Sequence, residues 1–181
     1  MKFLIYILII LNTGCQQQKI IFLEKDDFSL SYPSHLKLDD SEKDGVSIIL
    51  ATKKENDNDN FIENVNLVVK NIGDENFIDF TNKTVKQIND FGYIKENKRF
   101  KINNKDCLRL VIEATQNNIG LTFIQHYYVE NGKAYVLTFS CETKKLNKYF
   151  NEMNEILLSF KIKSLCSLFL NITIKSTTSL I

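Results

Sequence analysis

The sequence predicts an α+β fold in which an antiparallel β-sheet is flanked by helices on both faces, an α/β/α sandwich. Three observations lead to this prediction. Several short segments alternate apolar and polar residues with the period of a β-strand. Residues 77–91 and 143–160 instead repeat apolar residues every three or four positions, as amphipathic helices do. The segment 107–139 has apolar residues on both faces of its predicted strands, so both faces need a cover.

The first strands follow from alternation and from the punctuation between them. Residues 28–32, "FSLSY", alternate apolar and polar side chains and stop at Pro33, the only proline. Residues 46–51 form an apolar run of strand length, and residues 64–69 alternate again. The stretch 53–60 between them is wholly polar and predicts a solvated loop.

The register of the later strands follows from one dipeptide. Asn131-Gly132 lies between two alternating runs and predicts a type I′ hairpin, whose two central residues need positive φ. This turn places Ile124 opposite Phe139. Keeping apolar residues together then places Ile112 of the preceding strand opposite Phe123.

The four cysteines have different predicted roles. Cys15 belongs to the opening segment, which leaves Cys107, Cys141 and Cys166. The predicted register separates Cys107 and Cys141 by about 20 Å, from ~3.3 Å per residue along a strand and ~4.8 Å between strands. A disulfide needs Cα atoms within about 7 Å, so we expect no bond between them.

The opening segment is typical of an export signal. Lys2 is followed by an apolar run, Phe3 to Leu11, that is too short to span ~30 Å of hydrocarbon. The sequence Leu11-Asn12-Thr13-Gly14-Cys15 then resembles a bacterial lipobox, although Asn12 replaces the usual aliphatic residue. We interpret residues 1–14 as a lipoprotein signal peptide and Cys15 as the lipid attachment site. An ordinary cleaved signal and an N-terminal core strand are the alternatives.

The remaining chain is organised as one domain. Residues 15–19 form a short tether, residues 20–162 the domain, and residues 163–181 a tail that is an extra strand, a partner-binding segment or a frayed end. The composition, with 44% hydrophobic and 25% charged residues, is that of a globular protein. A formal net charge of +1 without a basic block gives no electrostatic case for nucleic acid as a partner.

A search for catalytic chemistry yields no catalytic residue, metal site or cofactor. The two histidines, His35 and His126, have no ligand spacing, and neither a nucleophile elbow nor a phosphate-binding glycine loop occurs. One polar cluster, formed by Arg109, Glu113 and His126, falls on a semi-buried sheet face. A cross-strand ion pair is one interpretation of this cluster, and a ligand-binding patch is the other.

Five segments, taken in order, resemble the PsbP/DcrB-like α/β/α sandwich family. They are "FSLSYP", "ENVNLVVKNI", "NKDCLRLVIEATQ", "FIQHYYVENGKAYVLTFSCE" and "FNEMNEILLSFKI". The resemblance covers roughly residues 20–162 and excludes the tail. It implies an antiparallel sheet flanked by helices, and a protein that acts as an accessory or binding protein rather than as an enzyme.

These observations together predict a lipid-anchored bacterial envelope protein that acts as a non-catalytic accessory or protein-binding module. Its expected partners are the membrane, through the lipid, and an envelope protein or complex. It would face the periplasm or the exterior, and Gln16 after the cysteine favours the outer membrane. The alternative is a small-molecule or ion-binding envelope lipoprotein, which a polar-lined pocket between helix and sheet would favour. A hydrolase would require a buried acid–base pair.

Overall fold

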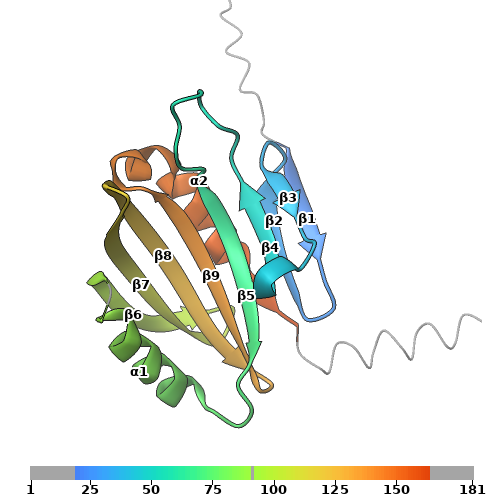
Figure 1. Cartoon of the computed structure of the whole chain (residues 1–181). Coiled ribbons are helices and arrows are strands. Elements are labelled where there is room, and N and C mark those ends of the chain that lie inside the picture. Colours follow the sequence, from blue (N-terminus) through green and yellow to red (C-terminus); the bar gives the residue numbers. More distant parts are fainter. Residues whose placement is uncertain (1–18, 91, 164–181) are drawn as a thin grey trace, which may run out of the picture.

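A seven-stranded antiparallel sheet forms the centre of the molecule (Figure 1). The structure, a computed structural model, describes residues 19–90 and 92–163. The strands lie side by side in the order β3 (Lys37–Asp39), β4 (Val46–Ala51), β5 (Asn64–Asn71), β9 (Lys133–Glu142), β8 (Ile119–Glu130), β7 (Lys105–Gln116) and β6 (Tyr93–Ile102).

The predicted hairpin register is confirmed. Ile124 lies opposite Phe139, and Ile112 lies opposite Phe123. Asn131 and Gly132 have φ of 52° and 72°, as a type I′ turn requires. A side chain at position 132 would also meet the Gly73 carbonyl oxygen at 3.1 Å, so the turn closes tightly against the end of β5.

Two further hairpins turn on asparagine pairs. Asn103-Asn104 joins β6 to β7 and Asn117-Asn118 joins β7 to β8, and all four residues have positive φ between 50° and 64°. Asparagine tolerates this left-handed region better than other residues with a Cβ atom. All three turns between β6, β7, β8 and β9 therefore contain asparagine at a position of positive φ, although only Asn131-Gly132 has the sequence typical of a type I′ turn.

A second, smaller sheet corrects the prediction of a single one. It consists of β1 (Ile20–Glu24), β2 (Phe28–Pro33) and β10 (Lys161–Ile162), with β2 in the middle. The strand predicted at residues 28–32 is β2, so it forms but does not join the main sheet. Lys161 of β10 pairs with Ser29, far away in the sequence, and a two-residue strand carries no periodic signal of its own.

The two predicted helices are present with shorter bounds. α1 spans Phe77–Ile88, and the Asn76 side chain caps it by accepting a hydrogen bond from the Asp79 N–H at 3.0 Å. Phe91, which the prediction included in this helix, lies outside the described residues. α2 spans Leu146–Ser159 and follows the short 3-10 helix η2 (Thr143–Lys145). In the described part of the chain, no helix is long and apolar enough to cross a membrane.

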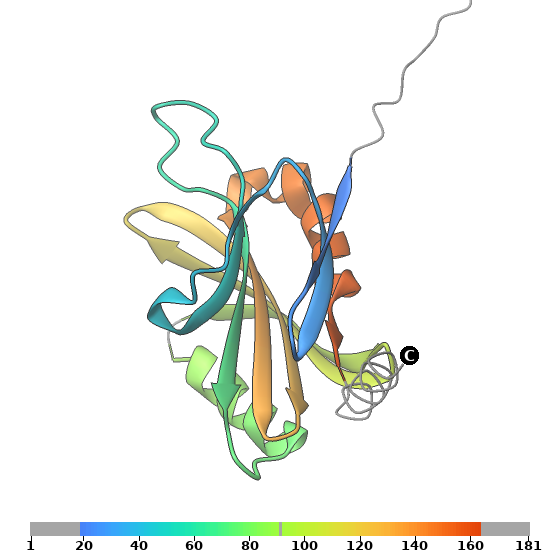
Figure 2. The same ribbon diagram turned by 90° about the vertical axis from the view of Figure 1, so that its right-hand side faces the viewer.

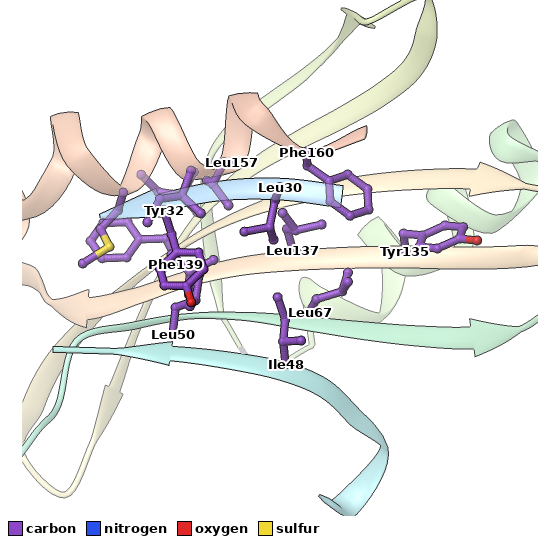
Figure 3. Close-up of a cluster of buried hydrophobic side chains, with 14 of the residues drawn as sticks. Leu30, Tyr32, Ile48, Leu50, Leu67, Tyr135, Leu137, Phe139, Leu157 and Phe160 are labelled. Carbon is purple, nitrogen blue, oxygen red and sulfur yellow. The ribbon is translucent and has the colours of Figure 1, made fainter. Parts of the chain in front are cut away.

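One face of the main sheet, here called the core face, is covered by α2 and the small sheet together (Figure 2). Leu30 of β2, Leu157 of α2 and Leu137 of β9 are fully buried in this layer (Figure 3). Phe160, which follows α2, stacks near the rings of Tyr128 and Tyr135, with centroids 5.4 and 6.0 Å away. The main hydrophobic core therefore lies between the two sheets and α2.

The opposite face, here called the α1 face, carries a smaller core. Phe77, Phe80 and Ile88 of α1 pack there against Leu110 of β7 and Tyr127 of β8. On β5, Asn66 of the same face is only half-buried. The sandwich prediction was therefore right in its α+β class and antiparallel sheet but incomplete in its layers, because a second sheet joins α2 on one face while α1 packs over part of the other.

Candidate functional site

The predicted polar patch contains one true cluster, centred on Arg109. The register places Arg109 of β7 opposite His126 of β8, both on the core face. Arg109 Nη1 lies 3.3 Å from His126 Nε2 and donates a hydrogen bond to Asn154 Oδ1 at 2.9 Å. Its Nε pairs with Glu96 Oε1 at 3.0 Å, and the guanidinium carbon lies 5.9 Å from the centroid of the Phe150 ring. The guanidinium is thus engaged on several sides by protein groups.

His126 is held neutral by its surroundings. Its side chain is fully buried, between the rings of Phe100 and Tyr128. Burial, with a smaller contribution from the charge of Arg109, lowers the pKa of His126 to about 3. Arg109 has only donors, so His126 Nε2 accepts and Nδ1 carries the proton. That Nδ1 has no hydrogen-bond partner among the described residues.

Glu113, the third predicted member, is not part of this cluster. It lies on β7 opposite Thr122, four residues along the strand from Arg109, and pairs with Lys95 at 2.7 Å. The structure brings in Glu96 and Asn154 instead, which sequence reasoning missed. Asn154 follows Phe150 by four residues on α2, so helical spacing already placed it on the helix face that packs against the sheet.

A second charged cluster surrounds Lys145, at the junction of η2 and α2. Lys145 Nζ lies 2.8 Å from Asp59 Oδ1 and 3.3 Å from Glu63 Oε1, and 3.6 Å from Glu55 Oε2. The Asp59 and Glu63 side chains are 2% and 0% exposed. The prediction that residues 53–60 form a wholly solvated loop was therefore wrong at Asp59, because a lysine far away in the sequence binds the loop down.

The charges of this cluster stabilise one another. Hydrogen bonds from Lys148 and then Tyr149 lower the pKa of Glu55 from 4.5 to about 2. A hydrogen bond from Lys145 does most to lower the pKa of Asp59. Burial alone would lower the pKa of Lys145, but its hydrogen bonds and charge interactions with Asp59 and Glu63 outweigh burial and raise it. The cluster is an ion-pair network that fastens the loop to α2.

The two cysteines of the described ranges keep their protons at neutral pH. Cys107 and Cys141 are free and fully buried. Burial raises the pKa of Cys107 to about 11 and that of Cys141 to about 12, so both remain thiols at neutral pH. Within residues 19–90 and 92–163, no group of three or more histidine, cysteine or acidic side chains is arranged to hold a metal ion.

A pocket of about 370 Å³ lies between α1 and the sheet, and sequence reasoning did not locate it. Within it, the Tyr127 hydroxyl donates a short hydrogen bond to Gln125 Oε1, and Gln125 Nε2 donates to Thr138 Oγ1 at 3.1 Å. Burial raises the pKa of Tyr127, which therefore stays a neutral phenol. The lining consists of Thr84, Gln87, Ile88, Ile112, Ala114, Phe123, Gln125 and Tyr127.

Comparison with family models and with curated proteins gives no match for this chain.

Solved structures, in contrast, share its fold. The cyanobacterial PsbP (CyanoP) of Synechocystis sp. PCC 6803 has a TM-score of 0.63 at 15% identity, covering 83% of this chain and 96% of that one. PA94 of Pseudomonas aeruginosa, a protein of unknown function described as a putative regulator, has a TM-score of 0.58 at 8% identity and covers 80% and 98%. LpqN of Mycobacterium tuberculosis, involved in cell envelope biogenesis, has a TM-score of 0.57 at 11% identity and covers 82% and 92%.

At identities this low the likeness concerns the fold. The PsbP-like fold that the sequence resemblance predicted is confirmed.

Proposed function

We propose that this protein is a lipid-anchored component of a bacterial cell envelope that works by binding rather than by catalysis. Cys15, its proposed lipid attachment site, lies outside the described residues, as do the signal peptide, most of the tether and the tail after residue 163. The proposal therefore combines the sequence of the opening segment with the geometry of the domain that follows it. LpqN, with the same fold, is involved in envelope biogenesis, which supports this setting.

The exposed apolar edge of β1 is the observation that carries the proposal. Ile20 and Phe22 are 57% and 62% exposed and point away from the core, while Ile21 and Leu23 of the same strand pack inward. Only four residues, Gln16 to Lys19, separate Cys15 from Ile20. At about 3.5 Å per residue this tether spans at most ~17 Å. An apolar strand edge held so close to a bilayer suits contact with a membrane-associated partner.

The state of the titratable groups supports binding over catalysis. A general acid or base works best with a pKa near the operating pH. His126 has a pKa of about 3, and the thiols of Cys107 and Cys141 have pKa values of about 11 and 12. Each of these three groups is buried, and each has the charge state that its burial favours. None of these three groups therefore exchanges a proton near neutral pH.

The partner we propose is an envelope protein or complex, in the membrane to which the tether holds the domain. The net charge of +1 offers no electrostatic attraction to nucleic acid. We assign the protein to the outer membrane where the cell has one, on the residue that follows Cys15, and expect it to face the periplasm or the exterior.

Intact mass and membrane fractionation of the native protein beside a Cys15→Ser variant test the anchor. We expect the native protein to begin at an acylated Cys15 and to fractionate with membranes, and the variant to be unprocessed or soluble. Two soluble proteins without added lipid mass would overturn the tethered function.

Affinity capture after cross-linking in intact cells then compares Phe22→Ser with Ile78→Ser, a matched change at a 51% exposed residue of α1. A partner bound through β1 is lost only in Phe22→Ser.

A second candidate function is small-molecule binding, and the pocket between α1 and the sheet favours it. The pocket combines an apolar floor with several polar groups, the arrangement found in most ligand sites. The two functions are compatible, because β1 and this pocket lie on different elements.

A further inference from the structure

The pocket under α1 exists because two small residues occupy positions where large ones would fill it. On α1, Phe80, Thr84 and Ile88 follow one another at four-residue spacing and so lie on one stripe, with the short threonine in the middle. On β7, Ala114 follows Ile112 on the same face of the strand. Thr84 and Ala114 both line the pocket, together with the buried Ile88 and Ile112.

The polar groups of the pocket form an ordered chain rather than a random set. Gln125 accepts from Tyr127 and donates to Thr138, which fixes the orientation of its amide. Tyr127 uses its one proton in this chain, so its oxygen can still accept a hydrogen bond, and the second amide proton of Gln125 remains available. The chain thus presents both an acceptor and a donor to a molecule in the pocket.

The side chains that line the pocket are also uncharged. None of the eight lining side chains is ionised at neutral pH. Bringing an ionised group into such a site without a partner costs far more than bringing in a hydroxyl or an amide that is hydrogen-bonded.

We propose that this pocket binds an uncharged, largely apolar molecule that carries a hydroxyl or amide group at one end. The apolar body packs against Ile88, Ile112 and Phe123, and the polar end meets Tyr127 and Gln125. The volume of about 370 Å³ suits a small ligand. This inference makes the second candidate function specific, and it does not depend on the lipid anchor or on β1.

Photo-cross-linking of the full chain in whole-cell lysate, which holds the protein whether or not it is acylated, tests the proposal with a matched pair of probes. The first is 4-(hydroxymethyl)benzophenone, which is uncharged and carries one hydroxyl. The second is 4-benzoylbenzoate, which has the same two rings with a carboxylate. Tryptic peptide 110–133 contains five of the eight lining residues and serves as the readout. We expect saturable labelling of this peptide by the first probe, and at least tenfold less by the second at equal concentration.

Two variants fill the pocket from its opposite sides. Ala114→Phe acts from the sheet and Thr84→Leu from the helix, and each should reduce labelling of the peptide at least tenfold. Ala51→Phe is the matched control, because Ala51 is also a half-buried strand alanine but does not line the pocket. Thermal unfolding of each variant shows whether the fold is intact, and Thr84→Leu preserves the test if Ala114→Phe fails to fold.

The outcomes separate this proposal from the others. Three results would overturn it. Labelling of peptide 110–133 could persist in both filling variants, labelling could occur only in other peptides, or the two probes could label the peptide equally. Intact mass of the protein from the same lysate reports acylation of Cys15 independently. A protein that is acylated but unlabelled therefore refutes the pocket alone, and a labelled but unacylated protein refutes the anchor alone.

Discussion

The two faces of the main sheet are built from the same strands, yet they are used in different ways. On β9, Tyr135, Leu137 and Phe139 point to the core face and are almost completely buried. Their neighbour Val136 points to the α1 face and is half-buried. Alternation along β9 therefore supplies an apolar core on one side, whereas the other side carries the half-buried Val136 beside the buried polar residues Thr138 and Ser140. The difference indicates that stability is concentrated on the core face, which leaves the α1 face free to retain a pocket.

The largest effect on stability is expected from shortening one of two neighbouring side chains on β9. Leu137→Ala removes a fully buried side chain and should cost about 3–5 kcal/mol in the free energy of unfolding. Val136→Ala on the opposite face should cost about 1 kcal/mol, since its side chain is half-buried. Urea unfolding of both variants measures the two losses. Equal losses would show that the two faces contribute alike.

The ion cluster at one end of the core face gives the next effect. Lys145→Met leaves the buried carboxylates of Asp59 and Glu63 without their cation and should cost about 3 kcal/mol at pH 7. Lys148→Met is the control, because the Lys148 side chain is 58% exposed, and it should cost far less than Lys145→Met.

The pH dependence of the same variant sharpens this prediction. Lys145 does most to lower the pKa of Asp59 in the folded protein, so Asp59 contributes stability above its ordinary pKa of 3.8 that is lost as the pH falls below that value. Between pH 5 and pH 2.5, the free energy of unfolding measured in urea should fall less for Lys145→Met than for the wild type. Parallel losses would show that Lys145 does not set the pKa of Asp59.

His126 provides a smaller, separate pH effect within the core face. Its folded pKa of about 3 lies below its ordinary 6.5, so the unfolded chain binds the proton more tightly between these values. Stability is therefore lost as the pH falls from 6.5 toward 3, by on the order of 2 kcal/mol between pH 7 and pH 4.5. His126→Gln, unfolded in urea at the same two pH values, should lack this part of the loss. The idea fails if the free energy of unfolding changes equally between pH 7 and pH 4.5 in the wild type and in the variant.

The smallest effect is expected on the α1 face. Gln125→Leu breaks the chain from Tyr127 to Thr138, and Gln125 itself is only half-buried. We expect a loss of about 1 kcal/mol in urea unfolding. Ser140→Ala, on the same face but outside the chain, should change stability less. A loss as large as that of Leu137→Ala would mean that this face, too, is part of the rigid core.

The strand register was predictable because the evidence for it is local. Asn131-Gly132 fixes the turn, and the alternation on either side then fixes which residues oppose each other. The same register placed Arg109 beside His126. Glu96, which completes that cluster, lies on β6, and a register shift between Ile94 and Glu96 made its position invisible to simple strand pairing.

The sequence by itself determined the α+β class, the meander and its register, and it predicts the anchor at Cys15. The tertiary structure alone decided which side chains become buried partners across long separations. Lys145 meets Asp59, and Lys161 pairs with Ser29, although nothing in the intervening sequence links them. It also decided that Thr84 and Ala114 line one pocket. Local patterns encode periods and turns, whereas cavities and ion clusters arise where separate elements meet, and only the folded chain fixes that meeting.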